Sequence, residues 1–129
     1  MNKERIVVIC PGRGSYTRET SSYLHLYGKN LIKDIKWMDF ERESRGRESL
    51  TKLDSQKFQS NIHMLGENAS SLIYACSLSD FSYIDINKYE IISVLGNSMG
   101  WYTSLVLSGA ISKKNGFHLI EKMGSMMKK

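Results

Sequence analysis

Two short stretches of the chain are apolar at nearly every position, which is typical of strands buried on both faces of a sheet. Residues 5–10 read Arg-Ile-Val-Val-Ile-Cys, and residues 90–95 read Glu-Ile-Ile-Ser-Val-Leu. A weaker third run lies at residues 83–86. Each strong run is followed by a glycine-containing turn and then by a helical pattern, so we expect an α/β fold with a short parallel sheet.

Apolar residues at a spacing of three or four predict helices between the two strong runs. One such stripe comprises Leu24, Tyr27, Leu31 and Ile35. A single amphipathic helix is expected over residues 58–79. Residues 41–48 alternate in the sign of their charge, which predicts a solvated loop or a frayed helix.

The C-terminal part of the chain predicts two more helices. Residues 99–107 carry a broad apolar surface and contain no proline, and Gly109 is a typical C-cap for that helix. Ser112 is a good N-cap for a last helix. The apolar stripe of the last helix consists of Phe117, Ile120, Met123 and Met127.

The most informative motif directly follows the second apolar run. Gly96-Asn97-Ser98-Met99-Gly100 has the Gly-x-Ser-x-Gly spacing of a nucleophile elbow, a sharp turn that presents a serine between a strand and a helix. The flanking glycines allow neighbouring backbone to approach closely. Ser98 is therefore the candidate nucleophile. The alternative is that the glycines only permit a tight turn and that Ser98 caps the helix.

Composition narrows the class of protein. The 129 residues suffice for one domain, and neither a membrane-spanning apolar stretch nor a cleavable leader is recognisable, so we expect a soluble, cytoplasmic protein. Cys10 and Cys76 lack a metal-type spacing and are expected to be reduced core residues, and no metal site is expected.

The net charge of +5 is scattered along the chain rather than gathered in a patch with interleaved aromatic residues. This distribution argues against nucleic-acid binding. A modest positive field suits an acidic partner protein or a phosphate-bearing cofactor, but an ordinary solvated surface is the default explanation.

A dinucleotide-binding fold is the alternative for the first strand and its loop. Gly12 and Gly14 begin a Gly-x-Gly pattern, and Asp34 lies 20 residues beyond Gly14. The third glycine of that fingerprint is replaced by Thr17, which removes the close helix–strand packing that the fingerprint needs.

Three stretches together resemble a known family: Pro11-Gly12-Arg13-Gly14-Ser15, the elbow pentapeptide, and Trp101-Tyr102-Thr103-Ser104-Leu105-Val106-Leu107-Ser108-Gly109-Ala110-Ile111-Ser112. In order and approximate spacing they are similar to the N-terminal half of the malonyl-CoA:acyl-carrier-protein transacylases and of the acyltransferase domains of fatty acid and polyketide synthases. The similarity runs over nearly all of the chain.

The resemblance implies that residues 1–129 form an incomplete α/β-hydrolase-like large subdomain, without the family's ferredoxin-like subdomain. It implies that Ser98 takes an acyl group from a coenzyme A thioester, which is a substrate rather than a bound cofactor, and passes it to an acyl carrier protein. The backbone N–H groups of Met99 and Arg13 match the family's oxyanion-hole donors.

Four residues depart from the family pattern. Arg13 replaces a glutamine, and its charge can face the oxyanion, a coenzyme A phosphate or solvent. Asn97 replaces the histidine that precedes the nucleophile, and Asn61 corresponds to a glutamine that binds substrate. Met123 replaces the arginine that pairs with a malonyl carboxylate, so the resemblance implies a neutral acyl group instead.

The family's general-base histidine has no counterpart, because His25 and His63 precede Ser98 and His118 follows it too closely. We therefore expect very low turnover from this chain alone. The narrow sheet also predicts open edges that a second polypeptide or another copy would cover. Two other functions stay open: a non-catalytic subunit that binds coenzyme A or a carrier protein, and a serine esterase.

Overall fold

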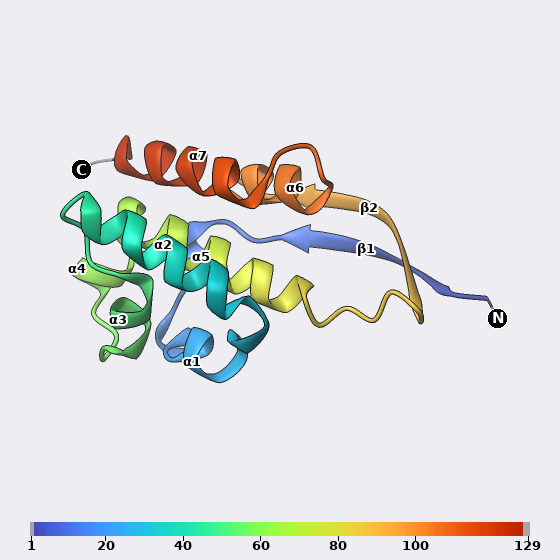
Figure 1. Cartoon of the computed structure of the whole chain (residues 1–129), viewed down its shortest axis with the longest axis horizontal. Coiled ribbons are helices and arrows are strands. Elements are labelled where there is room, and N and C mark those ends of the chain that lie inside the picture. The colour runs from blue at the N-terminus through green and yellow to red at the C-terminus, as the bar shows by residue number, and fades with distance from the viewer. Residues whose placement is uncertain (1, 128–129) are drawn as a thin grey trace.

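The computed structural model of this protein describes residues 2–127 and has a mixed α/β architecture. Strands β1 (Glu4–Cys10) and β2 (Tyr89–Gly96) pair in parallel, as the apolar runs predict. The helices are α1 (Tyr23–Tyr27), α2 (Ile32–Ser44), α3 (Leu50–Ser55), α4 (Ser60–His63), α5 (Gly66–Phe81), α6 (Gly100–Leu107) and α7 (Lys113–Ser125), and the 3₁₀ turns are η1 (Arg13–Ser15), η2 (Arg18–Thr20) and η3 (Lys29–Leu31). In Figure 1 the strands extend away from the group of helices.

The register of the sheet aligns the carboxyl ends of its two strands. Cys10 pairs with Gly96 at that end, and an irregularity after Ile6 leaves Ile92 as an extra residue in β2. The loop after β1 and the turn after β2 therefore leave the sheet side by side, at the edge where parallel α/β sheets place their functional loops.

Helix α5 forms the centre of the core. The residues of α5 itself are mostly small or apolar, and they leave no wide polar face. The helix is therefore buried almost throughout. It packs against α7 on one side and against α1 and α3 on another (Figure 1).

The expected single helix over residues 58–79 is wrong. The chain forms α4 and α5 instead, because Leu65 adopts an extended conformation between them. At the start of α5, a Cβ on Gly66 would lie 2.9 Å from the Gly124 carbonyl oxygen of α7. The side chain of Asn68 donates a hydrogen bond to the Ile62 carbonyl oxygen across the break (2.9 Å). Close tertiary contact thus fixes a kink that periodicity does not reveal.

The stripe that begins at Leu24 is likewise divided between α1, η3 and α2. The division falls at Gly28, where a Cβ would lie 2.5 Å from the Leu24 carbonyl oxygen. Leu31 and Ile35 are buried as the stripe predicts, whereas Tyr27 is about half exposed.

The charged segment at residues 41–48 also differs from expectation. Helix α2 continues through Ser44, and Arg42 is fully buried rather than solvated. Its guanidinium forms an ion pair with Glu121 of α7. A buried charge requires such a partner, which comes from 79 residues further along the chain.

Helix α6 ends, and helix α7 begins, at the residues that the sequence predicts. Gly109 adopts a φ of +87° just after α6, and the Ser112 side chain accepts a hydrogen bond from the Asn115 N–H at the start of α7 (3.1 Å). Both helix-terminus predictions are confirmed, because capping is decided by residues next to each other in sequence.

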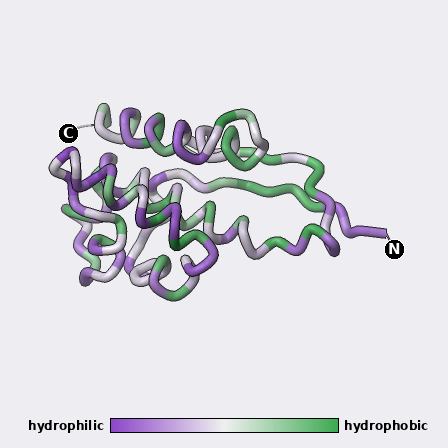
Figure 2. The backbone as a smooth tube through the Cα atoms, viewed as in Figure 1, coloured by the Kyte–Doolittle hydropathy of each residue, from purple (hydrophilic) through white to green (hydrophobic). Residues whose placement is uncertain are grey.

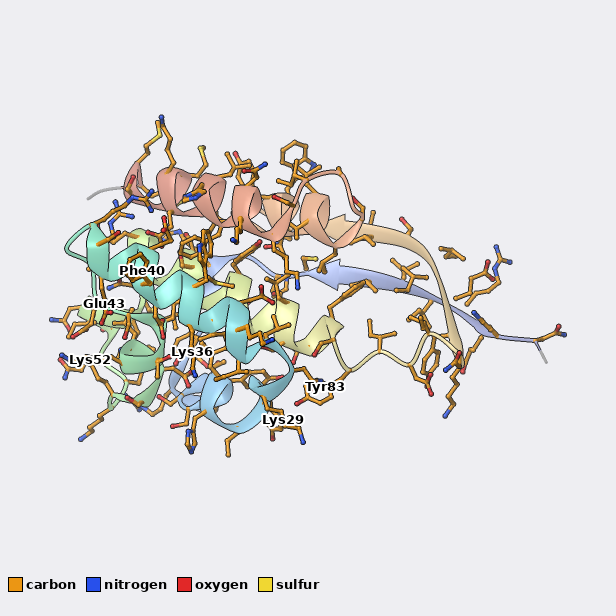
Figure 3. All side chains as sticks on the ribbon, viewed as in Figure 1. Lys29, Lys36, Phe40, Glu43, Lys52 and Tyr83 are labelled. Carbon is orange, nitrogen blue, oxygen red and sulfur yellow. The ribbon has the colours of Figure 1, made fainter. Side chains whose placement is uncertain are left out.

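The weak strand expected at residues 83–86 is absent, and these residues form a turn between α5 and β2. Tyr83 lies beside α1 (Figure 3), where its hydroxyl donates a hydrogen bond to the Tyr27 carbonyl oxygen (3.0 Å). The described sheet therefore has two strands only.

Large apolar side chains on the sheet remain accessible to solvent. Ile9 of β1 is 69% exposed, and Val7, Ile92 and Leu95 are about half exposed. Figure 2 shows the hydrophobic colour running along both strands. The narrow sheet thus has the uncovered apolar surface that its width predicts.

Within residues 2–127 no helix combines the length and the apolar character that crossing a membrane requires.

Candidate functional site

Ser98 stands at a sharp turn between β2 and α6. The strand ends at Gly96, the helix begins at Gly100, and Ser98 adopts a φ of +57°. This left-handed conformation costs a non-glycine residue about 1 kcal/mol, so it indicates a constraint imposed by the surrounding structure. The side chain of Ser98 is exposed. The elbow geometry predicted for this residue is confirmed.

The two glycines of the motif are required by close backbone approach. A Cβ on Gly96 would overlap backbone atoms of Gly100 and Trp101, and a Cβ on Gly100 would overlap the Cys10 carbonyl. The elbow is therefore packed directly against the end of β1, which accounts for the small residues on both sides of Ser98.

The loop after β1 lies against the elbow. The Asn97 N–H donates a hydrogen bond to the Cys10 carbonyl oxygen (3.0 Å), which continues the pairing of the strands by one step. Beyond it, a Cβ on Gly12 would lie 3.1 Å from the Ser98 Cβ and 3.7 Å from its hydroxyl oxygen. Two sequence motifs separated by more than 80 residues thus meet at one point.

Two backbone N–H groups near this point have no hydrogen-bond acceptor within residues 2–127. Neither the Arg13 N–H nor the Met99 N–H donates a hydrogen bond to another group within residues 2–127. Met99 precedes the first turn of α6, where the helix dipole also favours negative charge. Met99 as a whole residue is buried.

Arg13 connects this loop to a pocket of about 290 Å³. Its guanidinium donates a hydrogen bond to the Met64 carbonyl oxygen (3.3 Å). The residues that line the pocket are Arg13, Met64, Leu65, Gly66, Glu67, Gly124 and Met127. The pocket lies where α5 crosses α7, and its volume is near the lower limit for small-molecule sites.

The other residues expected to bind substrate are dispersed. Asn97 is exposed beside Ser98, but Asn61 is exposed on α4, and Met123 is half-buried against the core. None of these three residues lines the pocket next to Arg13. The structure therefore brings together Ser98, Asn97, Met99 and Arg13 at the elbow, whereas Asn61 lies on α4 and Met123 on α7.

No histidine forms a hydrogen bond with Ser98 in the part of the chain described. His63 is fully buried, and its Nε2 lies 2.7 Å from the Leu53 carbonyl oxygen. His25 is exposed on α1, and His118 lies 3.9 Å from a carboxylate oxygen of Glu41.

The two cysteines do not compete with Ser98 as nucleophiles. Both side chains are buried, and burial raises the pKa of the Cys10 thiol and of the Cys76 thiol. Thiols with raised pKa values stay protonated and unreactive near neutral pH. Residues 2–127 also contain no cluster of three potential metal ligands.

Sequence reasoning missed the buried ionic cluster around Glu121. Its carboxylate is held by Arg42, by Arg47 (2.6 Å) and by the Ser71 hydroxyl. The sequence did contain a signal for this burial. Glu121 lies four residues after Phe117 and directly after Ile120, which places it on the apolar stripe of α7.

The chain matches no protein-family model, and no curated protein and no solved structure is detectably similar to it.

Proposed function

We propose that this protein is an acyltransferase whose nucleophile is Ser98. The conformation of Ser98 is the observation that carries the proposal, because a serine at φ +57° on an exposed strand-to-helix turn is the arrangement of a nucleophile elbow. Its surroundings support the proposal, since Gly96, Gly100 and Gly12 all lie in close backbone contact with that turn.

The proposed fold is the large subdomain of an α/β-hydrolase-like acyltransferase. Parallel β1 and β2, the turn at Ser98 and helix α6 supply the strand–elbow–helix unit of such a subdomain. The resemblance of the three motifs to the malonyl-CoA:acyl-carrier-protein transacylases supports the same assignment.

The proposed reaction begins with attack of the Ser98 hydroxyl oxygen on the thioester carbonyl of an acyl-coenzyme A. This attack forms a tetrahedral intermediate, and its collapse breaks the carbon–sulfur bond and leaves the new ester. The departing thiolate takes up, through solvent, the proton that Ser98 loses. The N–H groups of Met99 and Arg13 would stabilise the oxyanion of the tetrahedral intermediate. A second attack, by the phosphopantetheine thiol of an acyl carrier protein, would release Ser98 in fatty acid or polyketide synthesis.

Slow turnover is part of the proposal. No histidine in the described chain contacts Ser98, so proton removal relies on solvent. A missing general base lowers rates by about 10²- to 10⁴-fold. Both formation and breakdown of the acyl-serine ester need these proton transfers, so both steps would be slow.

We propose a neutral acyl group as the substrate. The side chain at position 123 is a half-buried methionine, which offers no charge to a free carboxylate. Competition between acetyl-CoA and malonyl-CoA for the acyl-serine tests this point. We expect an acetyl adduct, and a dominant malonyl adduct would contradict the choice of substrate.

Intact-mass measurement after incubation with acetyl-CoA tests the function itself. The expected result is one acetyl adduct on the wild-type chain, and none on the Ser98→Ala variant. Ser93→Ala provides a matched control that removes a serine from β2 and should still be acylated. An adduct that persists in Ser98→Ala would locate the chemistry elsewhere.

A non-catalytic subunit that binds coenzyme A or a carrier protein is the second candidate. The lack of a histidine beside Ser98 favours it, together with the exposed apolar surface of the sheet, which suits a partner polypeptide. Binding of acetyl-CoA without any adduct would support this candidate. Rapid release of free acetate would instead indicate a serine esterase.

A further inference from the structure

A second cavity lies between the C-terminal end of α2, the loop that follows it, and α7. Its volume is about 520 Å³. The lining residues are Arg45, Arg47, His118, Glu121, Lys122 and Ser125. None of them lines the pocket beside Arg13, and none belongs to the elbow.

The only carboxylate in that lining is already neutralised. Glu121 is 3% exposed, and its carboxylate is paired with Arg47 (2.6 Å) and with the fully buried Arg42. Arg42 also donates to the carbonyl oxygens of Glu48 (2.7 Å) and Glu67 (2.9 Å), so it is fixed in place. The cavity wall at Glu121 therefore presents no free negative charge.

Two of the remaining lining residues, Arg45 and Lys122, are cationic and incompletely paired. Lys122 is exposed and has no ion-pair partner within residues 2–127. Arg45 has one contact with Glu41 at 3.5 Å, and its side chain is 45% exposed. Glu41 also lies 3.9 Å from His118. Among the lining side chains, Lys122 thus has no ion pair within residues 2–127, and Arg45 shares the Glu41 carboxylate with His118.

Basic residues near helix C-termini often only interact with the terminal carbonyl groups, and Lys122 lies in the last turn of α7. Two features go beyond that role here. Arg47 belongs to the loop after α2 rather than to a helix, and its ion pair with buried Glu121 orients it. The cations also surround a concave space whose volume lies within the usual range for small-molecule sites.

We propose that this cavity binds a small molecule through a phosphate group. Oriented guanidinium groups match the geometry of phosphate oxygens, and charge-assisted hydrogen bonds to them are about twice as strong as neutral ones. An anion also complements the unpaired charge of Lys122 and the loosely paired charge of Arg45. The same chemistry serves a free phosphate or diphosphate and the phosphates of a nucleotide.

Titration calorimetry at low ionic strength tests the proposal with inorganic phosphate, pyrophosphate and adenosine diphosphate as separate probes. We expect one site, with pyrophosphate binding more tightly than phosphate. Tighter binding of adenosine diphosphate than of pyrophosphate would identify a nucleotide as the ligand. Equal binding of the two probes would identify a free phosphate or diphosphate as the ligand. Absence of binding by all three probes at millimolar concentration would overturn the proposal.

Paired charge-removing variants establish where the anion binds. Arg45→Gln combined with Lys122→Gln should weaken pyrophosphate binding at least about tenfold, since each loses a charge within contact distance of the ligand. Lys33→Gln combined with Lys36→Gln removes the same charge from exposed positions on α2 and should change affinity less than about twofold. Figure 3 labels Lys36 on that helix. An equal loss in both pairs would overturn the proposal, because it would indicate non-specific attraction.

Amide chemical-shift mapping on the unmodified chain gives an independent location. Pyrophosphate should shift the signals of Arg45, Arg47, His118 and Lys122. Shifts confined to the loop at Arg13 would contradict the proposed site.

Discussion

Gly12 lies directly against Ser98. A Cβ at position 12 would lie 3.1 Å from the Ser98 Cβ, 3.7 Å from its hydroxyl oxygen and 3.1 Å from the Asn97 carbonyl oxygen. The first of these distances is shorter than ordinary van der Waals contact, so a side chain at residue 12 would require the loop after β1 or the elbow after β2 to shift by a few tenths of an ångström. This contact links the two motifs on which the proposed chemistry depends.

The variant Gly12→Ala is expected to slow acylation of Ser98 by about tenfold, because a displacement of a few tenths of an ångström disturbs the geometry of attack. The rate of adduct formation by intact mass measures the effect. Gly14→Ala is the matched control, since a Cβ there has nothing within 4 Å. Equal rates for the two variants would mean that the loop does not position Ser98.

Ser98→Gly is expected to be more stable than Ser98→Ala by about 1 kcal/mol, because glycine adopts a positive φ without the steric cost that alanine retains. Both variants lack the hydroxyl, so neither should be acylated. Urea unfolding compares the two free energies. Identical values would show that the turn at Ser98 relaxes when its side chain changes.

Glu121→Gln is expected to destabilise the fold by about 3–5 kcal/mol, because it leaves the buried charge of Arg42 without its counter-charge. Urea unfolding again provides the measurement. Glu48→Gln, which removes an equal charge from an exposed pair with Lys52 (3.2 Å), should cost no more than about 1 kcal/mol. Similar losses for the two variants would rule out a special role for the buried cluster.

Stability is expected to fall at alkaline pH. Burial, followed by the charges of Asp54 and Asp80, raises the pKa of the Cys76 thiol above its ordinary value of 9.0. The folded state therefore keeps this proton while the unfolded chain loses it, so the contribution is complete below pH 9 and declines as the pH rises further. The decline per ionising group is about 1.4 kcal/mol per pH unit.

The free energy of unfolding, measured between pH 8 and pH 11, checks this expectation. Cys76→Ala should reduce the slope of the free energy of unfolding against pH by about 1.4 kcal/mol per pH unit, the contribution of one ionising group. The slope will not vanish, because burial and the hydrogen bond to Asp54 also raise the pKa of Tyr16. An unchanged slope in Cys76→Ala would refute the role of this thiol.

Local features were predictable where neighbouring residues decide them. The strands follow from unbroken apolar runs, the start of α7 from the Ser112 cap, and the turn at Ser98 from the glycines on either side of it. Each depends on steric or hydrogen-bonding preferences within a few residues, which the sequence states directly.

Long-range contacts decided the features that the sequence did not predict. The break between α4 and α5 depends on the approach of Gly66 to Gly124, and the burial of Arg42 depends on Glu121. In the sequence, Arg42 is one of several alternating charges and looks solvated. Only a partner on α7 makes its burial possible, since an isolated charge in the core is too costly.

The candidate site divides in the same way. The sequence by itself determined that Ser98 stands on a strained turn between strand and helix, because the local spacing of glycines allows that backbone. Only the tertiary structure decided that Gly12 meets Ser98 and that cations gather around the cavity at Glu121. Those relationships depend on how distant segments pack together, and packing minimises the free energy of the whole chain rather than that of any short segment.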